Sequence, residues 1–399
     1  MIIKKYLTVT LICILIGTTF IANVSGTIEK TSFFSTIESD DFDKSIEENM
    51  SLGHFPGLVA CIVKNNSVVW SKGYGYADIR PLHRRNATTF TIFPMASVSK
   101  SVAATAIMQL NETGLISLDE NISKFLPFDL KNPRFPKVNI TARMLLAHQS
   151  SLKKMGYFVS VYSLYVKNHI NWVEKYLKKP SSWFDYAPGE NVFYASIDIN
   201  ILGYVIENIT GQTYSDYCQE HIFKPLNMTN TSFYLSDFNI AQLVRQYVWL
   251  KVIYIQVPIM KITKSMFPAG GIRSNIDDMS HFLIMHTNGG IYNGVRILNE
   301  SSVEEMHRAQ YPESLDEGHN HGLGWYFKNY SDDEIYGGHD GVHLGTYTVM
   351  KMRYSDEVGI LFFYNQHSYI LGFLHNTPDI EKQAAKGIRE ALFEKAEAF

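Results

Sequence analysis

Cysteine is scarce in this sequence. The 399 residues contain three cysteines, and only Cys61 and Cys218 lie beyond the first 26 residues. A small scaffold held together by disulfides needs several cysteine pairs, so that class of protein is excluded. Each of the two cysteines lies in an apolar segment, which favours a buried thiol and leaves open one disulfide between them.

A strong net charge is also missing. The formal net charge is -3, and no block of lysines or arginines is long enough to act as a binding arm. We therefore expect no nucleic-acid partner. Internal repeats and low-complexity linkers are absent too. With 46% hydrophobic residues, the chain can bury a large core, as a globular protein does.

Two further absences narrow the chemistry. The sequence has no Gly-x-Ser-x-Gly nucleophile elbow, which argues against an α/β-hydrolase. The stretch "GHNHG" places His319 and His321 two residues apart, but no third metal ligand follows at a recognisable spacing. We expect a glycine-rich loop there, and we expect neither a metal ion nor an organic cofactor.

The N-terminus has the pattern of a secretory signal. Lys4 and Lys5 precede an apolar run over residues 6–22, and small residues follow it. This pattern predicts a signal peptide over residues 1–26 and a secreted protein, with a retained membrane anchor as the alternative. Eleven Asn-x-Ser/Thr sequons follow, from Asn49 to Asn329, and fit glycosylation in a secretory route.

Strand-like patterns occur at both ends of the chain, and helix-like patterns lie between them. "GLVACIVKNNSVVWSKGYG" predicts a hairpin, and "GTYTVMKMRY" and "VGILFFYNQ" predict two late strands. Helices are expected near 41–50, 141–148, 197–209, 213–224, 276–287 and from about 379 to the end. This order predicts an α+β fold whose antiparallel sheet comes from about 41–95 and 321–399, with a mostly helical part over about 96–320. An active site would lie at the seam.

The predicted helical part also contains one long apolar run and one pair of acidic residues. The apolar run over residues 247–260 is too short to span a bilayer, so we interpret it as core of the helical part instead of a lipid contact. Asp277 and Asp278 precede an apolar helical pattern. We interpret them as capping residues of that helix.

The stretch "FPMASVSKSVAATAIMQLNETG" places Ser97 and Lys100 at the start of an apolar helix. Residues three apart share a helix face, so an amine would stand beside a hydroxyl there. A serine in this place can be activated by the amine, and the backbone N-H groups of the helix start can stabilise an oxyanion. The alternative is that Ser97 or Ser99 only caps the helix.

At this motif the sequence resembles the serine β-lactamase and penicillin-binding-protein superfamily, and more narrowly the class C β-lactamase-like hydrolases and esterases. The resemblance covers nearly all of the chain from about Phe42 and implies a β-lactamase/transpeptidase-like catalytic domain over residues 27–399. Its segments occur in family order: "GYGYAD" (73–78), "FPMASVSKS" (93–101), "ITARMLLAHQSSL" (140–152), "FYASIDINILGYVIENITGQTY" (193–214), "FPAGGIRSNIDDMSHF" (267–282), "HGLGWYF" (321–327) and "GGHDGVHLG" (337–345).

The resemblance implies catalytic roles for three residues. Ser97 would be the acylated nucleophile and Lys100 its buried proton partner. Tyr194 would be the general base, serving Ser97 first and then the deacylating water. Family members normally carry Tyr-x-Asn here, but this chain has Ser196 at the asparagine position, and Ser151 stands where His-x-Ser-Gly would have its glycine.

The third motif of the superfamily corresponds to His339-Asp340-Gly341. It reads Lys-Thr-Gly in β-lactamases and often His-x-Gly in the wider family. The backbone N-H of Val342 would complete an oxyanion hole with that of Ser97. In β-lactamases the motif helps to hold the drug's carboxylate. We expect Asp340 to face that carboxylate and repel it, with His339 mostly neutral at pH 7.

These observations lead to one preferred hypothesis and two alternatives. The preferred one is a secreted serine hydrolase that forms an acyl-serine intermediate on a small-molecule or peptide substrate, an ester before an amide. A D-amino-acid peptidase or a β-lactamase would use the same residues. A catalytically silent binding or scaffold protein is the third possibility, because Ser196 interrupts a motif. The sequence does not indicate an oligomeric state.

Overall fold

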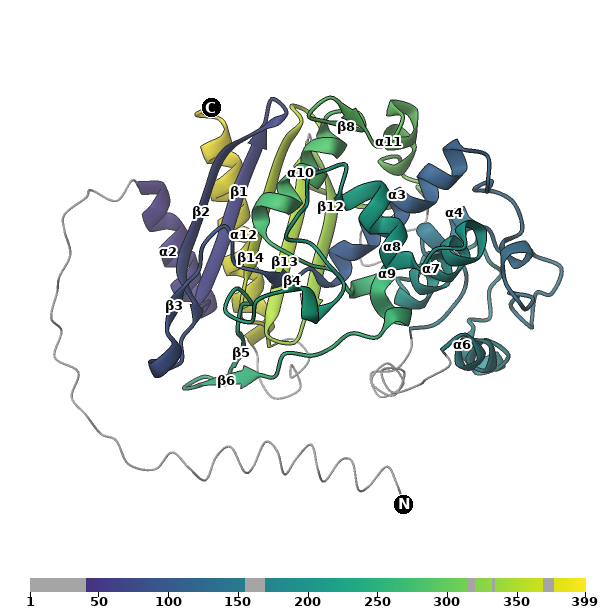
Figure 1. Ribbon diagram of the computed structural model, residues 1–399, viewed down its shortest axis with the longest axis horizontal. Helices are drawn as coiled ribbons and strands as arrows, with labels where there is room; N and C mark the ends of the chain where they lie inside the picture. The colour runs from purple at the N-terminus through teal and green to yellow at the C-terminus, as the bar shows by residue number, and fades with distance from the viewer. Residues whose placement is uncertain (1–40, 155–168, 314–319, 332–333, 369–376) are drawn as a thin grey trace, which may run out of the picture. The chain divides into compact units, whose positions relative to one another are not determined.

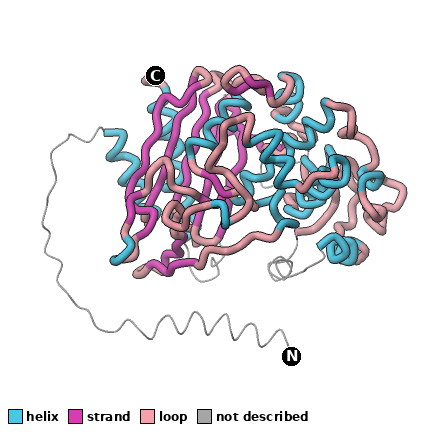
Figure 2. Tube along the Cα trace, in the orientation of Figure 1, coloured by secondary structure: helices cyan, strands magenta, loops and turns pink. Residues whose placement is uncertain are grey.

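The computed structural model describes residues 41–154, 169–313, 320–331, 334–368 and 377–399. These residues form an α+β fold in which helices cover a large sheet (Figure 1, Figure 2). The predicted fold class is confirmed. The predicted signal peptide, residues 1–26, lies outside the described residues.

The sheet has eight antiparallel strands that come from both ends of the described chain. The early strand β1 lies between its hairpin partner β2 and the last strand β14, and Leu58 stands opposite Tyr364. Asn65 and Asn66 both have positive φ in the hairpin turn, as the Asn-Asn signal predicts. In order across the sheet the strands are β10 (Asn320–His321), β11 (Tyr326–Ser331), β12 (Glu334–His343), β13 (Thr346–Arg353), β14 (Val358–Tyr364), β1 (Gly57–Lys64), β2 (Ser67–Asp78) and β3 (Arg85–Asn86).

Each face of the sheet carries its own helices. The terminal helices α2 (Asp41–Gly53) and α12 (Thr377–Ala396) pack together on one face, whereas α10 (Ile276–Thr287) covers the other (Figure 1). Neighbouring strand residues point to opposite faces, so Phe362 joins the core under α12 and Phe363 joins the core under α10. Both ends of the chain are therefore needed to complete the sheet and its cover.

The segment between β3 and β10 holds most of the described helices, joined by long loops, and the predicted helices lie within a few residues of the observed ones. Its α-helices are α3 (Ser99–Glu112), α4 (Ala142–Leu146), α6 (His169–Leu177), α7 (Ser196–Thr210), α8 (Tyr214–Cys218), α9 (Phe267–Gly270), α10 and α11 (Glu300–Met306). Single turns are η1 (Pro81–His83, before β3), η2 (Ala96–Val98), η3 (Ile122–Phe125), η4 (Pro180–Ser182), η5 (Gln219–Phe223), η6 (Leu235–Asp237) and η7 (Lys264–Met266). Two-stranded ribbons pair β4 (Phe93–Pro94) with β7 (Arg273–Ser274), β5 (Gln246–Trp249) with β6 (Tyr254–Val257), and β8 (Ile291–Tyr292) with β9 (Val295–Arg296).

We interpreted the apolar run over residues 247–260 as core of the helical part, and this interpretation is wrong. The run forms the β5–β6 hairpin, in which Tyr247 is buried and bridges to Gln366 beyond β14. The turn of the hairpin is open to solvent, and Val252 is 84% exposed. A continuous apolar run fits a buried helix and a hairpin equally well, because its periodicity does not separate them.

The cap of α10 also differs from the expectation. The Asn275 side chain accepts a hydrogen bond from the Asp278 backbone N-H at 2.8 Å, so Asn275 is the capping residue. The Asp278 carboxylate instead accepts from the Asn230 backbone and from the Thr231 hydroxyl. It therefore ties the loop before η6 to the first turn of α10.

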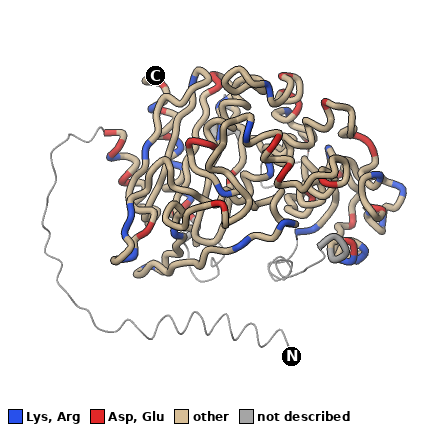
Figure 3. The backbone as a smooth tube through the Cα atoms, viewed as in Figure 1, with Lys and Arg blue, Asp and Glu red and all other residues tan. Residues whose placement is uncertain are grey.

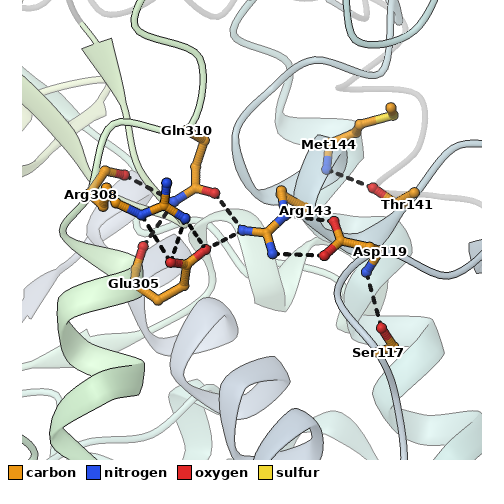
Figure 4. Close-up of polar contacts among 8 residues, drawn as sticks. All are labelled: Ser117, Asp119, Thr141, Arg143, Met144, Glu305, Arg308 and Gln310. Carbon is orange, nitrogen blue, oxygen red and sulfur yellow. Dashed lines mark hydrogen bonds and ion pairs between the residues drawn. The ribbon is translucent and has the colours of Figure 1, made fainter.

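Arg143 on α4 joins two distant segments of the helical part (Figure 4). Its guanidinium makes a bidentate contact with Asp119 at 2.7 and 2.8 Å, and it also donates to Glu305 on α11 and to Gln310. The Arg143 side chain is 21% exposed, and its partners raise its pKa further above the ordinary value. This network fixes α11 against α4.

Cys61 and Cys218 are free thiols buried in the core. Burial raises the pKa of both, that of Cys218 to about 12. The buried-thiol interpretation is confirmed, and the disulfide between them is not formed.

Acidic and basic residues are interspersed along the chain (Figure 3), as the small net charge suggests. In the described part of the chain, none of the helices has the length and apolar character needed to cross a bilayer.

Candidate active site

Ser97 lies in η2, a single helical turn that leads directly into α3. Ala96 just before it has a φ of 47°, in the left-handed region that residues with a Cβ rarely adopt. The Thr348 hydroxyl on β13 donates to the Met95 carbonyl at 3.0 Å and holds this backbone from the sheet side. A Cβ on Gly341 would lie 2.2 Å from the same carbonyl, so only glycine allows β12 to come this close. Ser97 is therefore fixed against β12.

The helix proper begins at Ser99, two residues later than predicted, and neither serine caps it. Ser99 is fully buried, and its Oγ accepts a hydrogen bond from the Ile272 backbone N-H at 3.2 Å. Ser97 is partly exposed. Of the two serines, Ser97 is therefore the more accessible to solvent.

The Lys100 ammonium group lies directly beside Ser97. Its Nζ donates to Ser97 Oγ at 2.8 Å and to the Ala269 carbonyl of α9 at 2.8 Å. The lysine side chain is fully buried, and this burial lowers its pKa from 10.5 to about 7. Near neutral pH a substantial fraction of the amine is therefore unprotonated and able to accept a proton.

Tyr194 lies close to Lys100, in the segment that leads into α7. Lys100 Nζ lies 5.1 Å from the centre of the tyrosine ring. Three imidazole rings surround the same ring, with centroid distances of 4.6 Å to His148, 6.0 Å to His339 and 6.5 Å to His321. The fold thus brings together the serine, lysine and tyrosine that the sequence analysis predicted as candidate catalytic residues.

His148 belongs to a buried polar group that the sequence analysis did not identify. Its Nδ1 lies 3.1 Å from Asp198 Oδ2, and the Ser150 hydroxyl donates to the other Asp198 oxygen at 2.6 Å. Burial raises the pKa of Asp198 well above its ordinary value. Ser151, which replaces the expected glycine, has a φ of 61°, the conformation that glycine adopts most easily. This group holds the His148 ring against Tyr194.

Ser196 is the first residue of α7 and lies partly buried one turn before Asn200. The Asn200 side-chain oxygen accepts the Ala269 backbone N-H at 3.2 Å. The carbonyl of that same residue accepts from Lys100. An amide one helical turn beyond the expected position therefore orients the lysine indirectly. The signal for it was an asparagine on the same face of the predicted helix.

The third motif lies on β12 next to the Ser97 turn. β11 pairs with β12 only as far as Gly338, so the described edge of β12 from His339 onward faces the turn. His339 Nδ1 donates to the Asp340 carbonyl at 2.7 Å. Burial, followed by the charge of Lys100, lowers the His339 pKa well below 6.5, so the imidazole is neutral at pH 7. Val342 is 42% exposed at this edge.

Asp340 does not face the site, contrary to our expectation. Its carboxylate accepts from the Tyr347 hydroxyl at 3.0 Å and lies 3.3 Å from Lys351 Nζ, both on β13. Strand residues alternate between faces, and His339 contacts Tyr194 on the opposite side of the sheet. Asp340 therefore points to the face covered by α12, where Tyr347 also packs.

The sequence analysis considered His319 and His321 as possible metal ligands and expected no metal site there. His319 lies outside the described residues, and the His321 ring packs against those of His148 and Tyr194. In the residues that the structure describes, no three His, Cys, Asp or Glu side chains are grouped so that they could hold a metal ion.

Comparison with known proteins gives the same family as the motifs. Residues 42–384 match the Beta-lactamase family. The chain is 33% identical over 192 residues to Protein flp of Staphylococcus aureus (strain N315), covering 48% of this chain and 37% of that protein. It is 29% identical over 204 residues to the putative penicillin-binding protein PbpX of Bacillus subtilis (strain 168), covering 49% and 48%. The chain thus spans less than half the length of these relatives.

Solved structures share the fold. The octameric penicillin-binding protein homologue from Pyrococcus abyssi superposes with a TM-score of 0.70 at 24% identity, covering 83% of this chain and 77% of that one. The D-amino acid amidase from Ochrobactrum anthropi SV3 superposes with a TM-score of 0.68 at 20% identity, covering 90% of this chain and 100% of that one. With the family match over residues 42–384 and the serine, lysine and tyrosine gathered at one seam, this chain belongs to the Beta-lactamase family, within the serine β-lactamase and penicillin-binding-protein superfamily.

Proposed function

We propose that this protein is a secreted serine hydrolase that cleaves esters, and amides less readily, through an acyl-serine intermediate on Ser97. The observation that carries the proposal is the contact of 2.8 Å between Lys100 Nζ and Ser97 Oγ, made by a fully buried lysine whose pKa is lowered to about 7. A buried amine with a pKa near neutrality is suited to proton transfer.

In the acylation step, Ser97 Oγ attacks the substrate carbonyl carbon while its proton passes to Lys100, directly or through Tyr194. The carbonyl oxygen becomes the oxyanion of a tetrahedral intermediate, and the backbone N-H groups of Ser97 and Val342 stabilise it. The carbon–oxygen bond of the leaving group then breaks. The proton taken from Ser97 returns to the departing alkoxide, which leaves as an alcohol.

In the deacylation step, a water molecule attacks the acyl carbon and gives its proton to Tyr194 or Lys100. The bond between the acyl carbon and Ser97 Oγ breaks, and the proton returns to the serine. The acid product leaves and the starting state is restored. Each half-reaction needs one proton acceptor with a pKa near the working pH, and Lys100, with its pKa lowered to about 7, meets that need.

The preference for neutral substrates follows from His339. In the β-lactamases that this chain resembles, a lysine at this position adds positive charge for the drug's carboxylate. The His339 imidazole is buried and neutral at pH 7, so it adds no such charge. A neutral ester has no carboxylate that this positive charge would bind, so its binding is unaffected. A cephalosporin has one, so its binding is weakened. Secretion belongs to the proposal on the strength of the N-terminal pattern over residues 1–26.

A fluorophosphonate probe tests the nucleophile. We expect the probe to modify Ser97 in the intact protein, as read by peptide mapping, and to leave Ser97→Ala unlabelled. Ser99→Ala is the matched control, because Ser99 is buried and hydrogen-bonded elsewhere; it should label normally. Labelling that persists in Ser97→Ala would refute the assignment, and a correctly folded wild type that does not label would favour a silent binding protein.

A substrate panel tests the reaction class. We expect kcat/KM for a short-chain p-nitrophenyl ester to exceed that for a D-amino-acid p-nitroanilide and for a chromogenic cephalosporin at pH 7. Faster cleavage of the D-amino-acid anilide would support a D-amino-acid peptidase instead. Efficient cephalosporin turnover would show that the neutral His339 does not exclude an anionic substrate.

A further inference from the structure

A small cavity lies beside α9, apart from the residues of the proposed reaction. Its volume is about 150 Å³, and aromatic rings form one wall. Phe233 and Phe267 stack with centroids 5.0 Å apart, and Tyr234 meets Phe267 edge-on at 5.4 Å. A cavity of this volume is large enough for a benzene ring.

Arg273 and Lys261 also line the cavity and give it positive charge. Arg273 lies on β7, is 5% exposed, and uses Nη2 to donate to the Met260 carbonyl. Among the described residues, no carboxylate lies within ion-pair distance of it. Asp237, on the turn that borders the cavity, accepts hydrogen bonds from the hydroxyls of Ser232 and Ser236.

A buried guanidinium without an anionic partner is unfavourable for the fold. Withdrawal of an unpaired charge from water opposes folding, and burial indeed lowers the Arg273 pKa from its ordinary value. A guanidinium has five N-H donors in a planar fork that matches a carboxylate. The Met260 carbonyl accepts from only one of these donors, which leaves donors to spare toward the cavity. A bound anion would both pair the charge and use these donors.

We propose that this cavity is a binding site for a small aryl carboxylate, held by Arg273 and Lys261 and packed against the rings of Phe233, Tyr234 and Phe267. The small volume and the aromatic wall favour a carboxylate attached to one ring over a bulkier, more hydrated phosphate. The site is separate from the acyl-transfer site, and its occupancy does not require Ser97 to be reactive.

The cavity has a short structural connection to the proposed reaction centre. Phe267 opens α9, and two residues later the Ala269 carbonyl accepts the hydrogen bond of Lys100. On the strand side, Arg273 pairs with Pro94 of β4, three residues before Ser97. A ligand that orders the Phe267 ring and Arg273 would thus act on the two segments that hold Lys100 and Ser97.

Isothermal titration of the full chain tests the site with phenylacetate and with phenylacetamide, its neutral counterpart of similar shape. We expect the wild type to bind the acid at least about tenfold more tightly than the amide, because charge-assisted hydrogen bonds to Arg273 are lost with the amide. Arg273→Met should bring the affinity for the acid down to that for the amide. Equal affinities for acid and amide in the wild type, or no binding of either, would overturn the proposal.

Two further arms keep the test decisive. Lys261 is exposed, so Lys261→Met should fold as the wild type does, as checked by circular dichroism, and should weaken binding of the acid by about threefold. An unchanged affinity in Lys261→Met, or in a folded Arg273→Met, would overturn the site. Protein blocked at Ser97 with a fluorophosphonate should still bind phenylacetate, and loss of binding would mean that the acid occupies the acyl site instead.

Discussion

Replacing Lys100 by methionine should change how the stability of the protein depends on pH. Burial lowers the Lys100 pKa from 10.5 to about 7. Each factor of ten in proton affinity is worth about 1.4 kcal/mol, so the buried ammonium opposes folding by roughly 5 kcal/mol at low pH. Between pH 7 and pH 10.5 the unfolded chain keeps this proton and the folded protein has released it. Since the unfolded state binds more protons, the wild type becomes more stable as the pH rises.

Urea denaturation of wild type and Lys100→Met at pH 6, 7, 8, 9 and 10 measures this effect. The free energy of unfolding of the wild type, relative to the variant, should rise by about 4 kcal/mol between pH 7 and pH 10. Other groups that titrate in this range are present in both proteins and cancel in the difference. Lys386→Met is the matched control, because it makes the same substitution at a lysine whose side chain is 62% exposed.

A difference between wild type and Lys100→Met that stays constant over this pH range would refute the reasoning. It would mean that the folded protein keeps the Lys100 proton as strongly as the unfolded chain does. The amine would then be charged at pH 7 and could not accept the Ser97 proton. The same experiment therefore tests the electrostatics of the site without any knowledge of the substrate.

Three further predictions concern single residues. Tyr194→Phe and Lys100→Ala should each lower kcat for the preferred ester by roughly 10²-fold or more. The double variant should lower kcat by less than the product of the two single reductions, because the two residues act as one unit. A reduction equal to that product would contradict the coupling. Asp340→Thr should change the ratio of kcat/KM for ester and cephalosporin by less than about twofold, since Asp340 points to the other face of the sheet; a larger change would mean that Asp340 reaches the substrate. Arg143→Met should lower the free energy of unfolding in urea by about 1–3 kcal/mol because it leaves Asp119 and Glu305 without their shared donor, and an unchanged stability would show that the network contributes nothing.

Local patterns predicted much of the fold because they carry their own physical signals. The β1–β2 hairpin follows from two apolar runs around Asn65 and Asn66, residues that tolerate positive φ. The spacing of Ser97 and Lys100 predicts side chains on one face, and the structure has them in contact at 2.8 Å. The run over residues 247–260 has no periodicity, and its hairpin was missed for that reason.

Features that depend on distant segments could not be predicted. The direction of Asp340 depends on which strand residue faces α12, and "GGHDGVH" shows no alternation of polar and apolar residues that would indicate it. The partner of Lys100 at Ala269 comes from a segment 169 residues away. Asn200 reaches that segment from a third element, α7. The direction of Asp340 and the contact between Lys100 and Ala269 leave no signal in their own stretches of sequence, whereas Asn200 is marked only by its place on the face of the predicted helix.

The candidate site combines two features that oppose folding, and both lie beside Ser97. Ala96 has a φ of 47°, in the left-handed region, and the amine of Lys100 is fully buried. Strain of this kind is worth of order 1–3 kcal/mol for each residue and persists only where the surrounding structure enforces it. Here the enforcing elements are β12 and β13 from one end of the chain and α9 from its middle. The long-range closure of the sheet is thus what keeps Ser97 and the buried Lys100 in contact.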